Sequence, residues 1–203
     1  MPNITLKDVS YRYKSSDKNA ISNINLTFEE GKVTAVVGPS GSGKTTLANA
    51  VCELLKERDM PVQIIDGDIL RSQLGNLFGY TRDERIRQSR VNRVLTGYLV
   101  QNGINVLIAV VAPYEEVRHG LREYLGKDYL EVYVKCPYEV CAARDVKGYY
   151  KLSAQNKIEN LNGANDVYEP PQQAELTVRT DEMSQDLCAE AVIQLLEERG
   201  YGV

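Results

Sequence analysis

The sequence lacks the features that mark membrane and secreted proteins. No uncharged apolar run approaches the roughly 18 residues that a membrane-spanning helix needs. The first residues, Met1-Pro2-Asn3-Ile4, have neither the charged nor the apolar region of a signal peptide. We therefore expect a cytoplasmic protein without a membrane partner.

Histidine and paired cysteines are scarce. The chain has one histidine, His119, and its four cysteines have no Cys-x-x-Cys spacing. These residues do not make a zinc site of the usual kind. The cysteines stand in apolar contexts, which predicts buried, reduced thiols at Cys52, Cys136, Cys141 and Cys188.

Glycine, proline and positive charge are also limited. The 15 glycines and 7 prolines among 203 residues exclude a collagen-like or low-complexity chain. The 24 Lys and Arg residues are outnumbered by 28 Asp and Glu residues, which gives a net charge of −4 and argues against a nucleic-acid partner. We expect one folded domain over residues 1–203 that holds an anionic ligand with a local cluster of cations.

What the chain does contain is an alternation of short apolar runs and amphipathic segments. The runs predict strands at 32–37, 62–65, 104–111, 131–134 and 176–180. The segments between them predict helices at 45–57, 69–78, 83–101, 137–143 and 183–198, with a further helix opened by Pro113. This order predicts an α/β fold of the P-loop NTPase type, with ligands at the carboxyl ends of a parallel sheet flanked by helices.

Two segments stand apart from this alternation. Residues 1–30 contain two stretches of alternating apolar residues, 4–13 and 24–28, and predict an N-terminal antiparallel β-hairpin. Residues 147–173 are polar, aromatic and proline-containing without periodicity, and predict a lid. Arg118, His119 and Arg122 are expected on a solvated helix face.

The strongest motif is Gly38-Pro39-Ser40-Gly41-Ser42-Gly43-Lys44-Thr45, which fits G-x4-G-K-[ST] between a buried strand and a helix. Such a loop points backbone N–H groups at phosphate oxygens, while its lysine supplies charge and its hydroxyl binds magnesium. We therefore expect ATP and Mg²⁺ as cofactors. The predicted nucleotide-binding residues are Gly41, Ser42, Gly43, Lys44, Thr45 and Thr46.

A second cluster of charge follows the second predicted core strand. Asp66-Gly67-Asp68-Ile69-Leu70-Arg71 places two carboxylates and a cation near the expected γ-phosphate. A hydroxyl acceptor needs a carboxylate that orients or deprotonates it, and the metal needs an acid nearby. The alternative is that Asp68 merely caps a helix, which would leave Asp66 unexplained.

Together these residues resemble the adenylylsulfate kinases, P-loop enzymes that phosphorylate the ribose 3′-hydroxyl of adenosine 5′-phosphosulfate. The resemblance runs from about Val33 to the C-terminus. It is carried by the phosphate loop, Asp66-Gly67-Asp68-x-x-Arg71, Arg144-Asp145-Val146-Lys147-Gly148 and Val167-Tyr168-Glu169-Pro170-Pro171.

The resemblance implies a role for each matching residue. Asp68 would be the catalytic base, Asp66 a carboxylate on the metal side with Thr45, and Lys44 the charge on the transferred phosphoryl group. Tyr80 would stack on the base of the acceptor nucleotide. The predicted substrate-binding residues are Arg71, Tyr80, Arg85, Gln88, Arg90, Ala112, Lys147, Gly148, Tyr149 and Leu161.

The departures from the family pattern lie on the acceptor side. The family has Asn-Ile-Arg-Arg, Ser-Pro and Phe-Thr-Gly-Ile-Asp where this chain has Gln88-Ser89-Arg90-Val91, Ala112-Pro113 and Leu161-Asn162-Gly163-Ala164-Asn165. Loss of an aromatic clamp and of an arginine favours an acceptor with another base or a tail other than sulfate. Cytidine diphosphoramidate, handled by relatives in capsular polysaccharide modification, is one candidate. Sequence drift without a change of acceptor is the alternative.

The N-terminal segment resembles the start of an ABC-transporter ATPase, in which an aromatic at the position of Tyr13 stacks on adenine. An ordinary strand tyrosine is the alternative. No Leu-Ser-Gly-Gly-Gln signature occurs, so a whole-chain ABC ATPase is disfavoured. An ABC-type fragment and a non-catalytic nucleotide-binding module remain the alternative functions, and the oligomeric state is open, with a homodimer as one alternative.

Overall fold

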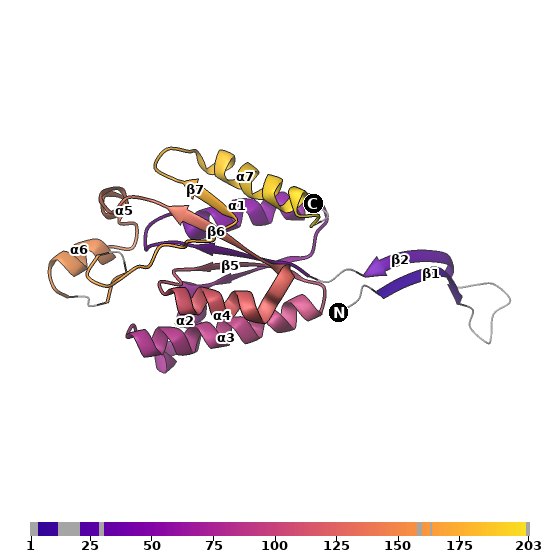
Figure 1. Cartoon of the computed structure of the whole chain (residues 1–203), viewed down its shortest axis with the longest axis horizontal. Coiled ribbons are helices and arrows are strands. Elements are labelled where there is room, and N and C mark those ends of the chain that lie inside the picture. Colours follow the sequence, from indigo (N-terminus) through magenta and orange to yellow (C-terminus); the bar gives the residue numbers. More distant parts are fainter. Residues whose placement is uncertain (1–3, 12–20, 29–30, 158–159, 163, 202–203) are drawn as a thin grey trace.

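The computed structural model describes residues 4–11, 21–28, 31–157, 160–162 and 164–201. Its centre is a parallel five-stranded sheet with the strand order β4-β5-β3-β6-β7. The strands are β3 (Val33–Val37), β4 (Val62–Asp66), β5 (Asn105–Val110), β6 (Tyr129–Lys135) and β7 (Leu176–Arg179). The predicted α/β fold with a parallel sheet is confirmed (Figure 1).

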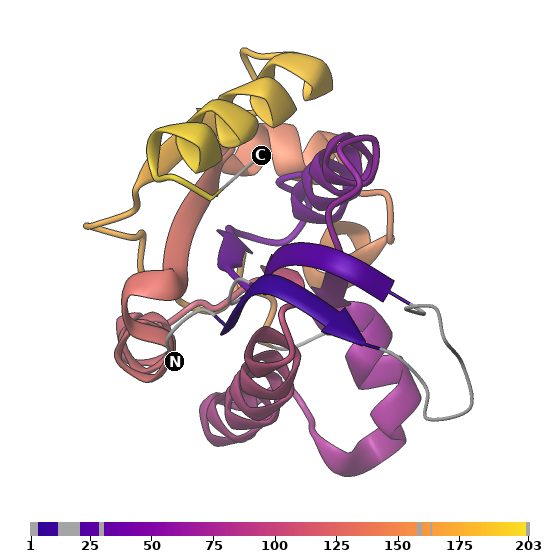
Figure 2. The same cartoon turned by 90° about the vertical axis from the view of Figure 1, so that its right-hand side faces the viewer.

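Helices cover both faces of this sheet (Figures 1 and 2). One face carries α1 (Lys44–Lys56) and α7 (Gln185–Glu198), and the other carries α3 (Arg82–Gln101) and α4 (Glu115–Leu125). Shorter helices lie near the carboxyl ends of the strands: α2 (Gly67–Leu74), α5 (Tyr138–Arg144) and α6 (Tyr149–Ala154). Two 3₁₀ turns, Gly75–Leu77 and Gly126–Asp128, follow α2 and α4.

The central strand β3 shows why the sheet needs both layers. All five of its residues are buried, because successive side chains point to opposite faces and each face is covered. Val33, Ala35 and Val37 belong to the apolar cluster under α3 and α4, whereas Val36 belongs to the cluster under α1 and α7. A continuous apolar run followed by a glycine loop is therefore a strand buried on both sides.

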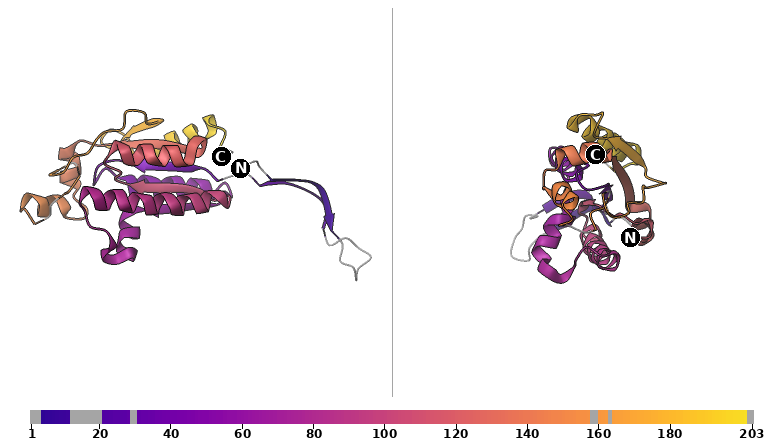
Figure 3. Two further views of the ribbon diagram at one scale, coloured as in Figure 1. Left: turned by 60° about the horizontal axis from the view of Figure 1, so that its bottom comes forward. Right: turned by 90° about the vertical axis from the view of Figure 1, so that its left-hand side faces the viewer.

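The predicted N-terminal hairpin is confirmed, with a longer second strand than expected. β1 (Ile4–Tyr11) and β2 (Ile21–Phe28) pair antiparallel as a separate two-stranded sheet. Figure 3 shows this hairpin at the end of the molecule opposite to α6. Tyr13 lies outside the described residues, so its stacking on adenine stays a prediction.

Two expectations about side chains were tested by burial. The four cysteines are free and buried, as predicted. His119 is exposed beside Glu123, also as predicted. The expectation for Arg118 is wrong: this residue is only 3% exposed, because its guanidinium turns inward beneath the loop that precedes α4.

No described helix is long and apolar enough to cross a membrane.

Candidate active site

The phosphate loop lies between β3 and α1, where the strand ends and the helix begins. Gly43 is the N-cap of α1, and Gly41 and Gly43 have φ of 78° and 96°, values that favour glycine. The Thr180 hydroxyl donates to the Ser42 carbonyl at 2.8 Å, and the Tyr150 hydroxyl donates to the Ser40 carbonyl at 2.7 Å. The loop is thus held from β7 and α6 while the open N-terminus of α1 faces the site, an arrangement that binds phosphate.

Lys44 is the first residue of α1, at the end of this loop. Its side chain turns back along the loop, and its Nζ donates to the Pro39 carbonyl at 2.8 Å. Burial lowers the pKa of Lys44 from 10.5 to about 8, although Asp68 and Asp66 oppose that change. A buried ammonium without a full counter-charge is matched to an anionic ligand such as phosphate.

Asp66, at the end of β4, is the helix cap, contrary to the alternative that assigned a cap to Asp68. Asp66 Oδ1 accepts from the N–H groups of Asp68 at 2.9 Å and Ile69 at 3.1 Å, so it caps α2. Its Oδ2 accepts from Thr45 Oγ1 at 2.6 Å. One buried carboxylate therefore fixes the start of α2 and faces the hydroxyl of the phosphate loop.

Asp68 is free of any capping role, and its carboxylate forms an ion pair with Lys147 from the segment after α5. Both side chains are about half exposed, at 55% and 47%. The contact joins the end of β4 to the N-terminal part of the predicted lid. Asp68 and Lys147 therefore face the space above the phosphate loop.

Two cavities meet at Asp68. The first, of about 610 Å³, is lined by the phosphate loop and by residues of α3, α4 and the end of β5. The second, of about 320 Å³, contains Tyr80, Tyr149 and Leu161. Asp68, Arg85 and Ser40 line both cavities.

Tyr80 forms a wall of the second cavity between two arginines. The Arg71 guanidinium lies 4.5 Å from the centre of the Tyr80 ring, and that of Arg85 lies 5.4 Å away. Arg71 donates to the carbonyl of Phe78, and Arg85 to the carbonyls of Tyr80 at 2.9 Å and Asn160 at 2.6 Å. Burial lowers the pKa of Arg85. The arginines thus border the base-sized cavity while being held by backbone oxygens.

Gln88 and Ala112 are brought together on the other side of the first cavity. Gln88 is 5% exposed, accepts from Arg71 and donates to the Gly67 carbonyl at 3.3 Å. Ala112 has φ of 41°, a strained value for a residue with a Cβ. Both residues line the first cavity.

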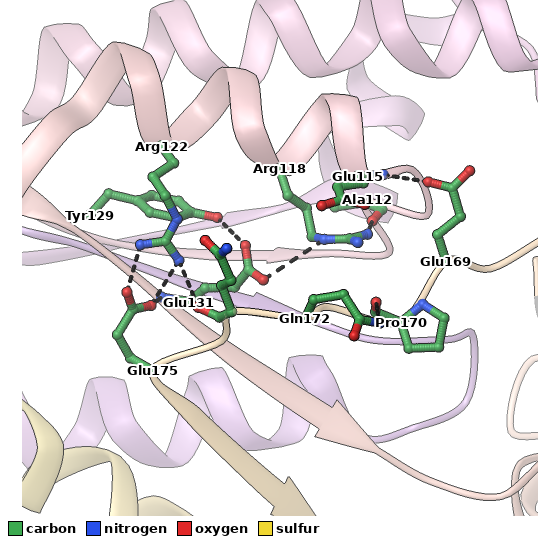
Figure 4. A network of polar contacts seen from close by, with 11 residues as sticks. Ala112, Glu115, Arg118, Arg122, Tyr129, Glu131, Glu169, Pro170, Gln172 and Glu175 are labelled. Carbon is green, nitrogen blue, oxygen red and sulfur yellow. Dashed lines mark hydrogen bonds and ion pairs between the residues drawn. The ribbon is translucent and has the colours of Figure 1, made fainter.

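A polar network behind the first cavity holds the loop of Ala112 (Figure 4). Arg118 donates to the Ala112 carbonyl at 2.8 Å and lies 3.8 Å from Glu131 on β6. Glu169, in the C-terminal part of the predicted lid, accepts from the N–H of Glu115 at 2.7 Å. The start of α4 is thus held both by the sheet and by the C-terminal part of the predicted lid.

The remaining predicted residues divide between the site and its surroundings. Gly41, Gly43, Thr45 and Thr46 line the first cavity. Ser42 is buried and lines neither cavity, and Gly148 is the N-cap of α6, with φ of 70°. Arg90 is exposed and lines neither cavity, because it lies on the face of α3 turned away from Gln88. Leu161 is 7% exposed and packs with Cys141 and Tyr150.

Sequence reasoning missed several residues that build the site. Arg118 and Glu131 were not recognised, although a glutamate in an otherwise apolar strand is a signal of a buried partner. Tyr150 and Thr180, which hold the phosphate loop, carried no motif. Their role depends on contacts 110 and 138 residues away in the chain, which periodicity does not report.

Comparison with known proteins identifies the family. The family model described as adenylylsulphate kinase matches residues 30–179. The chain belongs to the adenylylsulphate kinase family. It is therefore an ATP-dependent nucleotide kinase, a phosphotransferase with a hydroxyl group as acceptor.

Relatives and solved structures agree with this membership. The chain is 42% identical to an adenylyl-sulfate kinase of Halothermothrix orenii, over 85% of this chain and 93% of the relative. It is 36% identical to a probable adenylyl-sulfate kinase of Pyrococcus abyssi, over 85% and 98% of the two chains. The structure of the Mycobacterium tuberculosis APS kinase CysC in complex with AMPPNP and APS has a TM-score of 0.78 and 31% identity, covering 83% of this chain and 98% of that one.

The hairpin lies outside the matched region, because the family model begins at residue 30. The match also favours a kinase over the ABC-type fragment and the non-catalytic module. The recognition of the family from the phosphate loop and the two aspartates is confirmed.

Proposed function

We propose that this adenylylsulphate kinase family member transfers the γ-phosphoryl group of ATP to the ribose 3′-hydroxyl of a nucleoside 5′-phospho-anhydride. The observation that carries the proposal is the position of Asp68 at the junction of the two cavities. A nucleoside in the second cavity would present its ribose to Asp68, while ATP on the phosphate loop would approach from the first. The Mycobacterium tuberculosis relative, whose structure holds AMPPNP and APS together, supports two adjacent nucleotide sites.

Catalysis in this arrangement consists of positioning and neutralisation of charge. Asp68 accepts a hydrogen bond from the acceptor hydroxyl and takes its proton as the oxygen attacks phosphorus. Lys44 and the N–H groups at the start of α1 bind the oxygens of the transferred group. Lys147 leaves Asp68 for the negatively charged phosphates when the substrates bind, since the ion pair is half exposed and easily exchanged.

The residues around Thr45 fit a magnesium ion. Mg²⁺ binds few protein oxygens and completes its octahedron with phosphate oxygens and water. The Thr45 hydroxyl and the Asp66 carboxylate are neighbouring oxygen donors on the phosphate loop, and no group of three or more His, Cys, Asp or Glu side chains suited to a metal occurs in the described part of the chain. Thr45 would hold the ion as a ligand and Asp66 would orient it, and the ion would supply positive charge that offsets the charge of the phosphates.

The acceptor differs from adenylyl sulfate in this proposal. Leu161 stands where the family has a phenylalanine, so one aromatic face is lost and the described aromatic residues of the second cavity are Tyr80 and Tyr149. Ala112 brings no hydroxyl to the tail site, and both Arg71 and Arg85 are engaged by backbone carbonyls. These features favour a tail other than sulfate. Cytidine diphosphoramidate is one such nucleotide, since its tail ends in an NH₂ donor where adenylyl sulfate has only sulfate oxygens.

The test is a steady-state comparison of acceptors with ATP and Mg²⁺. The panel contains adenylyl sulfate, cytidine diphosphoramidate and their two base-exchanged analogues, so that base and tail are varied separately. We expect 3′-phosphorylated product, identified by phosphorus NMR, with a higher kcat/KM for an acceptor other than adenylyl sulfate. If adenylyl sulfate is the best acceptor at micromolar KM, the altered specificity is wrong while the kinase activity stands.

A further inference from the structure

The first cavity continues inward past Gln88 into the layer between the sheet and its helices. Its inner end is lined by four buried residues: Asn92 on α3, Ile108 on β5, and Val117 and Leu121 on α4. Three of these are aliphatic. We define the inner end by these four residues. Among them, Asn92 has the one polar side chain.

The Asn92 amide is incompletely satisfied in the described structure. The residue is 5% exposed, and its Oδ1 is buried without a hydrogen-bond partner among the described residues. The nearby Thr96 hydroxyl donates to the backbone carbonyl of Asn92 at 2.8 Å and leaves the amide free. An unpartnered buried amide oxygen costs about 1–3 kcal/mol. On the wall of a cavity, such a group is suited to a ligand that restores the hydrogen bond.

None of the described residues that form this inner end carries a positive charge. Arg85 lies nearer the mouth and is engaged by two carbonyls. Arg93, one residue after Asn92, lies over the Tyr124 ring at 5.1 Å. An anionic group at the inner end would lose its hydration without gaining a counter-charge, which is unfavourable. A neutral polar group would not meet this penalty.

We infer that the inner end is a subsite for the 5′ tail of the acceptor and that Asn92 selects a tail with an uncharged N–H or O–H group. The inference rests on the proposed function, because it places the base in the second cavity and the ribose at Asp68. A nucleotide bound in this way directs its 5′ substituent past Gln88 and Ala112, towards Asn92. Asn92 is a specificity-determining residue that binds the tail and takes no part in proton transfer.

The experiment compares two acceptors that differ in the tail alone: adenosine 5′-diphosphoramidate, whose tail ends in an NH₂ group, and adenylyl sulfate. Their kcat/KM values are measured for the natural protein, for Asn92→Leu and for Asn92→Ser. Thr96→Val is the matched control, because it also replaces a buried polar group of α3 but lies outside the cavity lining. The melting temperature of each variant is recorded.

We expect Asn92→Leu to lower kcat/KM for the diphosphoramidate by about tenfold, the loss of one hydrogen bond, with adenylyl sulfate changed by less than about threefold. Asn92→Ser, the smaller change, should lower the same ratio less and provides the test if the leucine variant does not fold. Thr96→Val should leave the ratio unchanged. Equal losses for both acceptors, or no change in the ratio, would overturn the inference.

The failure of this inference is distinguishable from that of the proposed function. If the natural protein phosphorylates neither acceptor nor any member of the wider panel, both are wrong. If it phosphorylates nucleotides but the Asn92 variants keep the natural ratio, only the subsite is wrong.

Discussion

At the scale of single residues, the site depends on charged groups that the rest of the fold does not fully neutralise. The Lys44 ammonium donates its hydrogen bond to a carbonyl oxygen of the phosphate loop, which does not balance its charge. Asp68 faces the cavity junction beside a half-exposed lysine, whereas Asp66 is committed to Thr45 and the start of α2. Two aspartates one residue apart therefore have separate tasks, because one is buried and one is exposed.

Lys44 makes ATP affinity depend on pH. Its pKa in the free protein is about 8, below the ordinary value of 10.5. The side chain is therefore protonated well below pH 8 and neutral well above it. Bound phosphates favour the charged form, and ATP should bind with constant affinity below pH 8 and more weakly as pH rises beyond it. Calorimetry in buffers of different ionisation enthalpy should show proton uptake on binding above pH 8.

The control for this prediction is Lys44→Met, which should bind ATP more weakly and without a pH step near 8. It should also lose turnover by a factor on the order of 10² or more, because a charge on the transferred group is removed. A retained pH step in the methionine variant would assign the effect to another group. Near-normal turnover would contradict the role of the phosphate loop.

Asp68→Asn should separate acceptor chemistry from donor binding. The amide keeps the size of the side chain but removes the base, so kcat should fall on the order of 10²–10⁴-fold. The dissociation constant of ATP should change much less than kcat, because the hydrogen bonds of Asp68 in the described structure are to Asp66 and Lys147 and not to the phosphate loop. Single-turnover kinetics and ATP titration measure the two effects, and equal losses in both would give Asp68 a metal-binding or structural task.

At the scale of the elements, the strands and helices of the core were predictable to within a few residues. The apolar run of β3, the glycines after it and the apolar spacing of α1 each predict the structure of their own segment. No contact from elsewhere in the chain is needed to make that prediction. The predicted helix at 69–78 shows the limit. The structure has α2 over Gly67–Leu74 followed by a 3₁₀ turn, since Asp66 caps the helix two residues earlier and Gly75 ends it.

The polar connections between elements were not predictable from the sequence. Arg118 was expected on a wet helix face because charged residues are usually exposed. It is buried because Glu131 and the Ala112 carbonyl, from two other elements, surround it. The proposed roles of Asp66, Asp68 and Lys147 follow from motifs, whereas this network and Asn92 depend on packing that only the three-dimensional structure contains.

The Arg118–Glu131 pair gives a prediction at this scale. Arg118→Met leaves Glu131 buried without its cation and should lower the free energy of unfolding by about 3–5 kcal/mol. The double variant with Glu131→Leu should recover part of that loss, because no unpaired charge remains. Urea unfolding measures both, with Arg90→Met as an exposed control that should stay within about 0.5 kcal/mol of the natural protein. A double variant no better than the single one would contradict the pairing.

At the scale of the whole molecule, the hairpin forms its own sheet and lies outside the residues that the family model matches. β1 and β2 pair only with each other, and the family match begins after them. Deleting residues 1–30 should therefore leave kcat and the dissociation constant of ATP within about twofold, the range of changes away from a site. Tyr13→Ala in the full chain is the companion variant. A clear loss of ATP affinity in both would support stacking of Tyr13 on adenine.

The strand order has a consequence for how the protein becomes active during synthesis. The phosphate loop follows β3, which is made first among the core strands, yet β3 pairs with β5 and β6, where Val33 lies opposite Val106 and Tyr129. A nascent chain in which the glycine motif is complete therefore still lacks β5 and β6, the strands that hold β3 and its loop in place. ATP can act as a folding ligand only after more than half of the chain has left the ribosome, so a truncated product carries the motif without the binding capacity.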